Sequence, residues 1–508
     1  MEKSLTSSTR PLLVVLCALC VLTSTSGQLS AGPFVYPDTR AGEIARAYFE
    51  AFNSGDADRL SEFEQTYRSA GALEKRSVAD RVERKLTLIG QVGKLTPAAV
   101  TAETSNSISI TAHADKAGMW LKCTFALEEE TPNKLVSLTM MPGSPPEGTS
   151  DRVEEWKDLA DLLGQIRQRT GAPAIAAAIV KKGTITDVAV VGERWVDSGQ
   201  NVERNDRFHV GSVTKSMTAT MIAALVQKEL LSWDFTVGDI LGDMEMRDEY
   251  RDVTLEQLLQ HRGGIPAYTQ VSDDEEQRLN NLPGTPRLQR EAFVAEVLTE
   301  KPEATPGKEM YYSNAGYAVA AVMAERVGSR SWEELIDIHL FEIIPMKTGG
   351  FGWPATPQNP NQPRGHFEEN NAFRTQIFGE YELGSYLAPA GGVHCSIEDL
   401  ARYAIVHLRG LAGRDKDLHA EIIVRLHTAP EATEGEMRYA AGWAIVDSPE
   451  VGEVHTHNGS AGTFFATIEL YPEYDTAVVL ATNVGFQAGS AISEEITTLV
   501  KQRTKEGK

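Results

Sequence analysis

The chain has 508 residues, too many for one small hydrophobic core, so two or three domains are expected. Its 49 Lys and Arg stand against 71 Asp and Glu, a formal net charge of −22. Such an acidic surface repels phosphate backbones and anionic lipid, so neither nucleic acid nor a membrane surface is an expected partner.

The chain opens with the pattern of a secretory leader. Lys3 and Arg10 flank an apolar run over 11–22, and small residues suited to cleavage follow it. We therefore predict a signal peptide over 1–27 and a mature protein exported to the periplasm or the extracellular space. The run is short for a bilayer span, and no later stretch is long and apolar enough, so no stable span is expected after cleavage.

Residues 38–141 are predicted to form a small α+β accessory domain. Apolar residues at helical spacing fill the stretch around 40–68, and "NSGD" divides it into two helices, the second beginning near Ala57. Three β-branched, alternating stretches follow and are typical of antiparallel strands. The "YFEAFNSGD" opening resembles the nuclear-transport-factor-like cone fold. We expect a dimerising or accessory role, so self-association through this domain is possible.

A Pro- and Gly-rich linker is predicted over 142–152, and a larger domain over 153–503. A helix is expected from Val153 to Arg169, then two strands joined by the tight turn "KKG". Three more strands and a final helix lie near the C-terminus. Strands at both ends with a helical middle predict one antiparallel sheet with a helical insertion. Cys123 and Cys395 are expected to be free, buried thiols.

The stretch "FHVGSVTKSMTATMIAALV" places Ser212 three residues before Lys215, at the start of an apolar segment. Residues three apart on a helix lie within reach of each other, so the lysine amine could take the proton of the serine hydroxyl. That role requires the pKa of the lysine to fall about 3 units from ~10.4. Taken alone, the pair favours a helix cap beside a solvated lysine.

Two further motifs accompany this pair. Tyr312 and Asn314 lie in a polar turn before an apolar helix, where a phenol and an amide could enter a cleft. His457 and Gly459 precede a strand, where a glycine lets a substrate approach the backbone. Each is also compatible with ordinary packing: a core tyrosine beside an Asn cap, and a histidine at a strand end.

Together these motifs resemble those of the serine β-lactamase and penicillin-binding-protein superfamily. Ser212-x-x-Lys215, Tyr312-x-Asn314 and His457-x-Gly459 occur in its order and spacing, in the branch of class C β-lactamases, D,D-carboxypeptidases, D-aminopeptidases and related esterases. The stretches "TLEQLLQHRGGIP" and "PAGGVHCSIEDLARYA" match as well. The resemblance covers roughly 153–500 and implies an α+β fold with a β-lactamase/transpeptidase-like antiparallel sheet flanked by helices.

The resemblance also implies a role for each residue of the motifs. Ser212 would be the acylated nucleophile, with Lys215 and Tyr312 sharing proton transfer. Asn314 would hold the substrate. His457 would stand in place of the first residue of the Lys-Thr-Gly triplet, before Gly459, and the backbone N–H groups of Ser212 and Ser460 would bind the oxyanion. No metal or cofactor is required.

Histidine in place of that lysine predicts weak pairing with a substrate carboxylate, except at lower pH. The expected function is an exported serine hydrolase, an esterase or D-amino-acid peptidase with weak or no β-lactamase activity. One alternative is an acyl-accepting receptor or scaffold that never turns over. Another is a metallohydrolase using His455, His457 and the His394-Cys395 pair.

Overall fold

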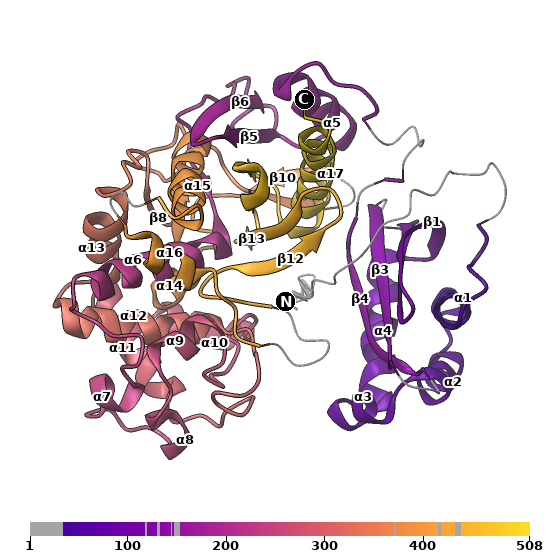
Figure 1. The fold of residues 1–508 in the computed structure, drawn as a ribbon, viewed down its shortest axis with the longest axis horizontal. Helices are drawn as coiled ribbons and strands as arrows, with labels where there is room; N and C mark the ends of the chain where they lie inside the picture. Colours follow the sequence, from indigo (N-terminus) through magenta and orange to yellow (C-terminus); the bar gives the residue numbers. More distant parts are fainter. Residues whose placement is uncertain are drawn as a thin grey trace, which may run out of the picture.

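The computed structural model describes residues 34–507 except 117–118, 130–132, 144, 147–152, 370–371, 415–417 and 432–437. The predicted signal peptide and most of the predicted linker therefore lie outside the described residues. An N-terminal α+β region stands beside a larger region that holds the rest of the chain (Figure 1). The exact domain boundaries stay predictions.

The N-terminal region has its helices first and its strands after them, as predicted. Its elements are α1 (Arg40–Ser54), α2 (Ala57–Tyr67), α3 (Ala70–Lys75), α4 (Val78–Val92), β1 (Leu95–Glu103), β2 (Ser107–Ala114), β3 (Met119–Leu127) and β4 (Leu135–Pro142). The strands form an antiparallel sheet in the order β1-β2-β3-β4. Helix α2 begins at Ala57 because the Asp56 side chain accepts from two backbone N–H groups of its first turn.

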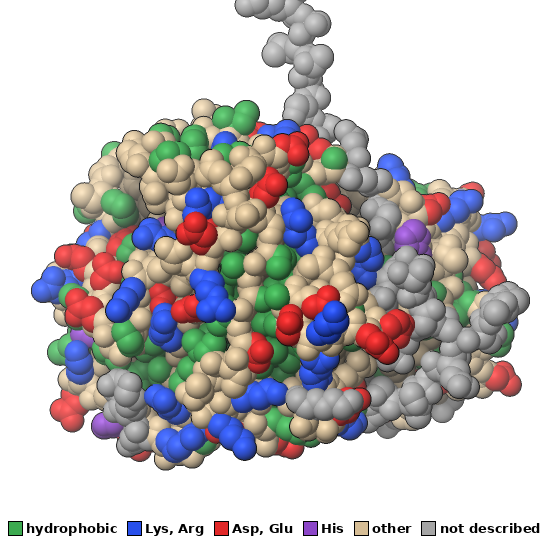
Figure 2. All heavy atoms as spheres, turned by 90° about the horizontal axis from the view of Figure 1, so that it is seen from above, with side chains coloured by type: hydrophobic (Ala, Val, Ile, Leu, Met, Phe, Trp, Pro, Cys, Tyr) green, Lys and Arg blue, Asp and Glu red, His purple; other side chains and the backbone are tan. Residues whose placement is uncertain are grey.

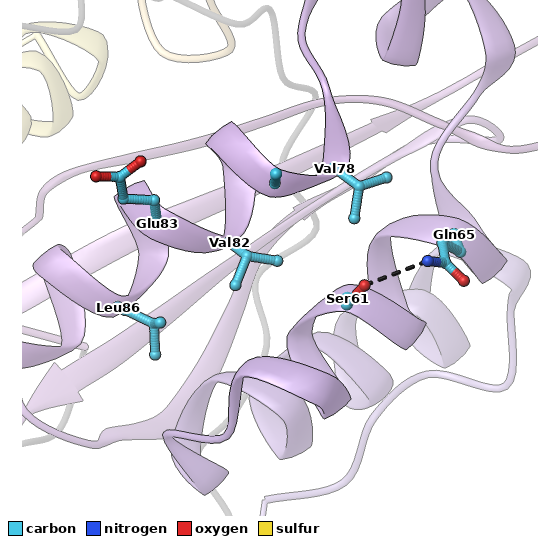
Figure 3. Close-up of a pocket in the computed structure, with 7 residues that line it drawn as sticks. Ser61, Gln65, Val78, Val82, Glu83 and Leu86 are labelled. Carbon is cyan, nitrogen blue, oxygen red and sulfur yellow. Dashed lines mark hydrogen bonds between the residues drawn. The ribbon is translucent and has the colours of Figure 1, made fainter.

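A shallow apolar groove opens between α2 and α4 of this region (Figure 3). Its lining residues are Ser61, Gln65, Val78, Ala79, Val82, Glu83 and Leu86. None of the predicted site residues contributes to it. The core of the region lies elsewhere, where the apolar face of α1 packs on β2 and β3.

The larger region is built on an antiparallel sheet of six described strands in the order β12-β13-β14-β15-β5-β6. The strands are β5 (Ala174–Lys181), β6 (Thr184–Gly192), β12 (Ala444–Ser448), β13 (Gly452–Ser460), β14 (Phe465–Tyr471) and β15 (Thr476–Thr482). Strand β15 pairs with β5, so the two ends of the region meet at the centre of one sheet. The predicted sheet from both termini is confirmed.

Helices cover both faces of this sheet. On one face α5 (Leu159–Thr170) and α17 (Phe486–Lys505) pack against the odd-numbered positions of β5, such as Ile175 and Ile179. On the other face α15 (Ile397–Leu411) and α6 (Thr214–Gln227) pack against the even-numbered positions. The alternation follows from the two-residue period of a strand, which sends successive side chains to opposite faces.

The insertion between β6 and β12 is mainly helical. Its remaining helices are α7 (Val237–Leu241), α8 (Asp248–Arg251), α9 (Leu255–Leu259), α10 (Asp273–Asn280), α11 (Pro286–Val297), α12 (Asn314–Gly328), α13 (Trp332–Ile336), α14 (Ala388–Gly391) and α16 (Ala420–Leu426). The short strands are β7 (Phe208–His209), β8 (Gly350–Phe351), β9 (His366–Glu369), β10 (Ala372–Thr375) and β11 (Val393–Cys395).

Two boundaries differ from the sequence prediction. The first helix of the larger region begins at Leu159 rather than Val153, because the Asp158 side chain caps it by accepting from Asp161 N–H. His457 and Gly459 lie within β13 rather than before a strand. The prediction for the thiols is confirmed: Cys123 and Cys395 are both buried and free.

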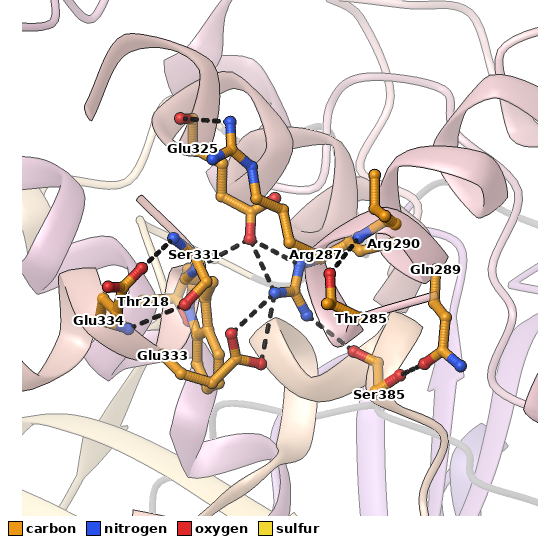
Figure 4. A network of polar contacts seen from close by, with 12 residues as sticks. Thr218, Thr285, Arg287, Gln289, Arg290, Glu325, Ser331, Glu333, Glu334 and Ser385 are labelled. Atoms are coloured by element: carbon orange, nitrogen blue, oxygen red, sulfur yellow. Dashed lines mark hydrogen bonds and ion pairs between the residues drawn. The ribbon is translucent and has the colours of Figure 1, made fainter. Parts of the chain in front are cut away.

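A buried ion-pair network joins the helices of the insertion (Figure 4). Arg290 of α11, which has no exposed surface, donates to Glu325 of α12 at 2.7 Å and to Glu333 of α13 at 3.1 Å. Glu325 also accepts from the Trp332 backbone N–H, and the indole of Trp332 donates to Thr218 of α6 at 3.1 Å. The network thereby fixes α12 relative to α6.

Acidic and basic side chains are interspersed on the face of the molecule seen in Figure 2, where neither sign gathers into a large patch. Within the described part of the chain, no helix is long and apolar enough to cross a membrane.

Candidate active site

Ser212 lies in a single 3-10 turn, η1 (Gly211–Val213), directly before α6. Gly211 adopts a φ of +50°, a left-handed conformation that favours glycine. Helix α6 is buried almost throughout, so the turn sits on a rigid base. Ser212 itself is only partly buried, which leaves its hydroxyl within reach of a substrate.

Lys215 lies one turn further, fully buried, and its amine faces the serine. The Nζ atom is 3.2 Å from Ser212 Oγ, 2.7 Å from Asn314 Oδ1 and 2.8 Å from the Ala390 carbonyl oxygen. The structure therefore brings together three residues from α6, α12 and α14 that are far apart in sequence. It places Ser212 and Lys215 in the contact that the helical spacing predicts.

Tyr312 and Asn314 enter from the turn before α12. The ring of Tyr312 lies beside the lysine, with Lys215 Nζ 4.8 Å from its centroid. The Asn314 amide nitrogen donates to the Tyr268 carbonyl at 3.0 Å, which orients the amide oxygen toward Lys215. Both residues thus lie at the serine and lysine pair.

His261, within the stretch "TLEQLLQHRGGIP", is a further neighbour of this site, and its role is not predicted by the sequence. Its Nδ1 accepts from Ser313 N–H at 3.1 Å, and its ring packs 4.3 Å from that of Tyr312. Burial and the Lys215 charge hold the pKa of His261 well below its usual value, so the ring is neutral. A neutral ring that accepts from Ser313 N–H keeps the Tyr312 turn in place.

The backbone of β13 lies directly against the serine turn. A methyl group built on Gly459 would lie 2.0 Å from the Val210 oxygen and 2.6 Å from Ser212 N. One built on Gly211 would lie 2.5 Å from Ser460 N. Only glycine fits at both positions, because the two backbones touch with no space for a Cβ. The predicted Gly459 and Ser460 therefore lie beside Ser212.

His457 is buried on β13 and has both ring nitrogens engaged. Its Nδ1 lies 2.8 Å from its neighbour's carbonyl, Asn458 O, which can only accept, so Nδ1 carries the proton. Its Nε2 lies 2.9 Å from the Tyr439 hydroxyl and therefore accepts from it. Burial, aided by the Lys215 charge, lowers the pKa of His457 to about 3.

Tyr439 is a residue of this region that the sequence reasoning missed. It follows a stretch outside the described residues and belongs to no recognisable motif. Its hydroxyl fixes the tautomer of His457, and its ring lies 4.7 Å from that of His261. The expected gain of carboxylate binding by His457 at lower pH is not supported, because a histidine with a pKa near 3 stays neutral in mildly acidic solution.

The metal-site alternative has no support in the described residues. Among them, no cluster of three or more His, Cys, Asp or Glu side chains could hold a metal ion. His455 instead lies in a chain of imidazoles. Its Nδ1 is 3.0 Å from His427 Nδ1, and His427 Nε2 is 2.9 Å from His407 Nδ1. His394 donates elsewhere, to the Gly352 carbonyl at 2.9 Å.

Comparison with known proteins gives a family match over most of the larger region. The family model described as Beta-lactamase matches residues 159–499. Penicillin-binding protein 4 of Amycolatopsis lactamdurans is 25% identical over 352 residues, which cover 65% of this chain and 85% of that protein. Unguisins hydrolase ungD of Aspergillus violaceofuscus is 24% identical over 346 residues, 61% of this chain and 58% of that protein.

A solved structure supports the same fold. EstCE1, described as a hydrolase with promiscuous acyltransferase activity, superposes with a TM-score of 0.57 at 16% identity, over 67% of this chain and 96% of that one. The likeness of fold agrees with the antiparallel sheet and flanking helices described above. With the family match spanning the serine turn, Tyr312 and His457, the chain belongs to the β-lactamase family and is a serine hydrolase.

Proposed function

We propose that this protein is an exported hydrolase that cleaves an ester or amide through an acyl-enzyme on Ser212. The observation that carries the proposal is the set of three contacts around Lys215 Nζ. Two of the three contacts are carbonyl oxygens, of Asn314 and Ala390, and the third is the serine hydroxyl. That arrangement assigns a direction to each of these three contacts.

The Lys215 charge that lowers the pKa of His261 and His457 belongs to its ammonium form, and the lysine must lose a proton before it can act as a base. The neutral amine then has two N–H donors and one lone pair. The two carbonyl oxygens can only accept, so they take the two N–H bonds of Lys215, and the lone pair is left facing the Ser212 hydroxyl. When the serine attacks, its proton moves to this lone pair. The resulting ammonium donates to the same three atoms, so these three contacts persist in both protonation states without any movement of the side chain.

The remaining residues act on the carbonyl and the leaving group. The N–H groups of Ser212 and Ser460 stabilise the oxyanion, Asn314 and Gly459 border the substrate, and Tyr312 shares proton transfer to the leaving group with Lys215. Water then attacks the acyl-enzyme by the same route. The contact between the two glycine backbones supports the oxyanion assignment, since it brings both N–H groups to one place.

His457 is poorly suited to bind a substrate carboxylate near the scissile bond. With Nδ1 donating to Asn458 O and Nε2 accepting from Tyr439, the ring has no free donor and no charge to offer. We therefore expect turnover of a chromogenic cephalosporin to be slow or absent between pH 5.5 and pH 8, with no rise at the acidic end. Turnover at a rate comparable to that of simple esters would contradict this expectation.

The acyl-enzyme is tested with a fluorophosphonate and intact-mass measurement. We expect one adduct per chain in the wild type and none in Ser212→Ala. A panel of short-chain aryl esters, D-amino-acid amides and D-alanyl peptides then measures turnover. An adduct without repeated turnover of any substrate would favour the alternative, an acyl-accepting receptor of the same fold. Absence of an adduct would contradict both readings.

A further inference from the structure

Three buried histidines form a hydrogen-bonded chain between β13 and α6, and the proposed reaction uses none of them. From the surface inward, the imidazole chain consists of Glu453, His455, His427, His407, Thr220 and the Ser216 carbonyl. Its first four contacts measure 3.1, 3.0, 2.9 and 3.3 Å. In the fifth, Thr220 Oγ1 donates to Ser216 O at 2.8 Å. The Glu453 side chain is 44% exposed, so this end of the chain reaches solvent, whereas the three rings are buried.

Both ends of the imidazole chain can only accept hydrogen bonds. The Glu453 carboxylate, which also accepts from Arg438 at 3.2 Å, and the Ser216 carbonyl have no proton to donate. Between them lie five contacts, and each needs one proton to become a hydrogen bond. Three neutral imidazoles and one hydroxyl supply four. The neutral chain is therefore one proton short, and one additional proton completes every contact.

The distances indicate where the neutral chain lacks its proton. The longest contact, 3.3 Å, lies between Thr220 Oγ1 and His407 Nε2. With the gap there, every imidazole proton points toward the carboxylate at the surface end. This assigns the proton to Nε2 of His455 and to Nδ1 of both His427 and His407.

His455 is the ring best placed to carry an additional proton. Burial lowers the pKa of His455 and the Arg438 guanidinium lowers it further, but the adjacent Glu453 carboxylate acts in the opposite direction. An imidazolium at this position donates to the carboxylate from Nε2 and to the next ring from Nδ1. Its positive charge is therefore paired, as a buried charge must be.

The groups that α15 and α16 pack against the chain stay neutral in mild acid. Burial lowers the pKa of His407 on α15 to about 3. Burial and the two neighbouring imidazoles hold the pKa of His427, at the end of α16, well below its usual value. Tyr403 of α15, whose hydroxyl lies 2.9 Å from Thr220 Oγ1, keeps its proton because burial raises its pKa.

We propose that the imidazole chain binds one proton from solvent and thereby switches all three rings between two arrangements. In the second arrangement the chain holds four ring protons instead of three. His455 gains one at Nδ1, and the protons of His427 and His407 move from Nδ1 to Nε2. His407 then donates to Thr220, which donates to the Ser216 carbonyl. The same heavy-atom contacts serve both arrangements.

The switch connects two elements of the candidate active site. Strand β13 carries His457 and Gly459, and α6 follows the turn of Ser212 directly. At the inner end of the chain, the Ser216 hydroxyl donates to the carbonyl of Val213, the residue after Ser212, at 2.8 Å. A proton taken up beside the surface of β13 therefore changes the hydrogen bonding of α6 one turn behind the serine.

The tautomers are measured by two-bond ¹⁵N–¹H correlation spectra of protein labelled with ¹⁵N-histidine. Signals are assigned by replacing each ring of the chain with glutamine in turn. At pH 7.5 we expect the proton on Nε2 of His455 and on Nδ1 of His427 and His407. Any other neutral tautomer at one of the three positions would overturn the proposal.

A titration from pH 7.5 to pH 5.5 tests the uptake of the proton. We expect His455 to gain its second proton below pH 6.5, and His427 and His407 to change tautomer at the same midpoint without becoming charged. A charged His455 beside an unchanged His407 would overturn the switch. A His455 that stays neutral until the protein unfolds would overturn the uptake of a proton.

Glu453→Lys tests the coupling along the chain without a change of pH. Its ammonium can donate to His455 Nε2 but cannot accept, so the tautomer of His407 should change to Nε2–H already at pH 7.5. Asp447→Lys is the matched control, because Asp447 also pairs with Arg438, at 3.2 Å. It should leave the tautomers of the wild type unchanged. An unchanged His407 in Glu453→Lys, or equal effects of both variants, would contradict the coupling.

Thr220→Val tests whether the effect reaches α6. Valine removes the acceptor of His407 Nε2–H in the protonated arrangement, so the midpoint for His455 should fall by about one pH unit. Thr220→Ser keeps a hydroxyl and should restore the midpoint of the wild type. An unchanged midpoint in Thr220→Val would contradict the connection to α6. None of these spectra depends on catalysis, so their outcome is independent of the fluorophosphonate result.

Discussion

Replacing Lys215 by methionine should lower kcat/KM for the best ester at least about 10³-fold, because a positioned general base and acid contributes typically 10²–10⁴-fold. Methionine has a similar length but no nitrogen, so the Ser212 proton has no acceptor. It also leaves the Asn314 and Ala390 oxygens without their donor, which costs about 1–3 kcal/mol of stability for each buried group. Steady-state kinetics and thermal melting measure the two effects separately.

Lys228→Met is the matched control, because Lys228 caps the other end of α6 and its amine lies 3.1 Å from His339 Nδ1. It should leave kcat/KM within about 2-fold of the wild type. Lys215→Arg distinguishes a base from a fixed charge. Arginine does not release its proton, so activity should stay as low as in Lys215→Met. Substantial activity in Lys215→Arg would contradict proton transfer through this side chain.

Acid should unfold the larger region well before the N-terminal region. Burial lowers the pKa of nine histidines there. In five of them the pKa falls to about 3 (His209, His407 and His457) or about 4 (His366 and His394). Below pH 6.5 these side chains take up protons in the unfolded chain but stay neutral in the folded one. Stability is therefore lost as the pH falls from about 6.5 toward 4.

The expected loss of stability at acidic pH is large. At pH 5 each such histidine costs roughly 2 kcal/mol, and five together cost roughly 10 kcal/mol, as much as the whole stability of a typical domain. The N-terminal region contains a single histidine, His113. Hydrogen exchange followed by mass spectrometry at pH 7 and pH 5 should show lost protection in β13 and α15 but retained protection in β2. Equal protection of β13 at both pH values would contradict this.

His394→Asn tests the contribution of one histidine. The asparagine amide can still donate to the Gly352 carbonyl, as His394 Nδ1 does, but it cannot titrate. The slope of the unfolding free energy against pH between 5 and 6.5 reports the number of protons taken up on unfolding. In this variant that number should be smaller by about one. His419→Asn, at an exposed position, should leave the slope unchanged.

The fold was largely predictable because its hydrophobic pattern is strong. The hairpin of β5 and β6 appears in the sequence as two apolar runs around "KKG", and its turn uses Lys182 and Gly183 at φ values of 52° and 72°. The start of α5 was not predictable from periodicity alone. Trp156 continues the apolar stripe but packs under Arg503 instead, and the cap at Asp158 decides where the helix begins.

The candidate site was predictable where residues form motifs and not elsewhere. Ser212 and Lys215 are linked by helical spacing, and family resemblance supplied Tyr312 and His457. Tyr439 has no such signal, because its neighbours are set by distant parts of the chain. The Pro- and Asn-rich stretch around Arg364 gave no residue-level expectation. Only the packing of Trp353, Phe378 and Phe464 shows that the stretch forms a groove.

The pairing of β15 with β5 has a consequence for how the protein acquires its shape. Strand β5 is synthesised about 300 residues before its partner, since Ile175 faces Thr482 across the sheet. Contacts this distant in sequence slow folding, because a long loop must close before they form. The Gly459 backbone that supports the serine turn also arrives late. A nascent chain therefore carries Ser212 without the β13 backbone beside it until translation is almost finished, and a polypeptide ending before β13 lacks one wall of the proposed catalytic centre.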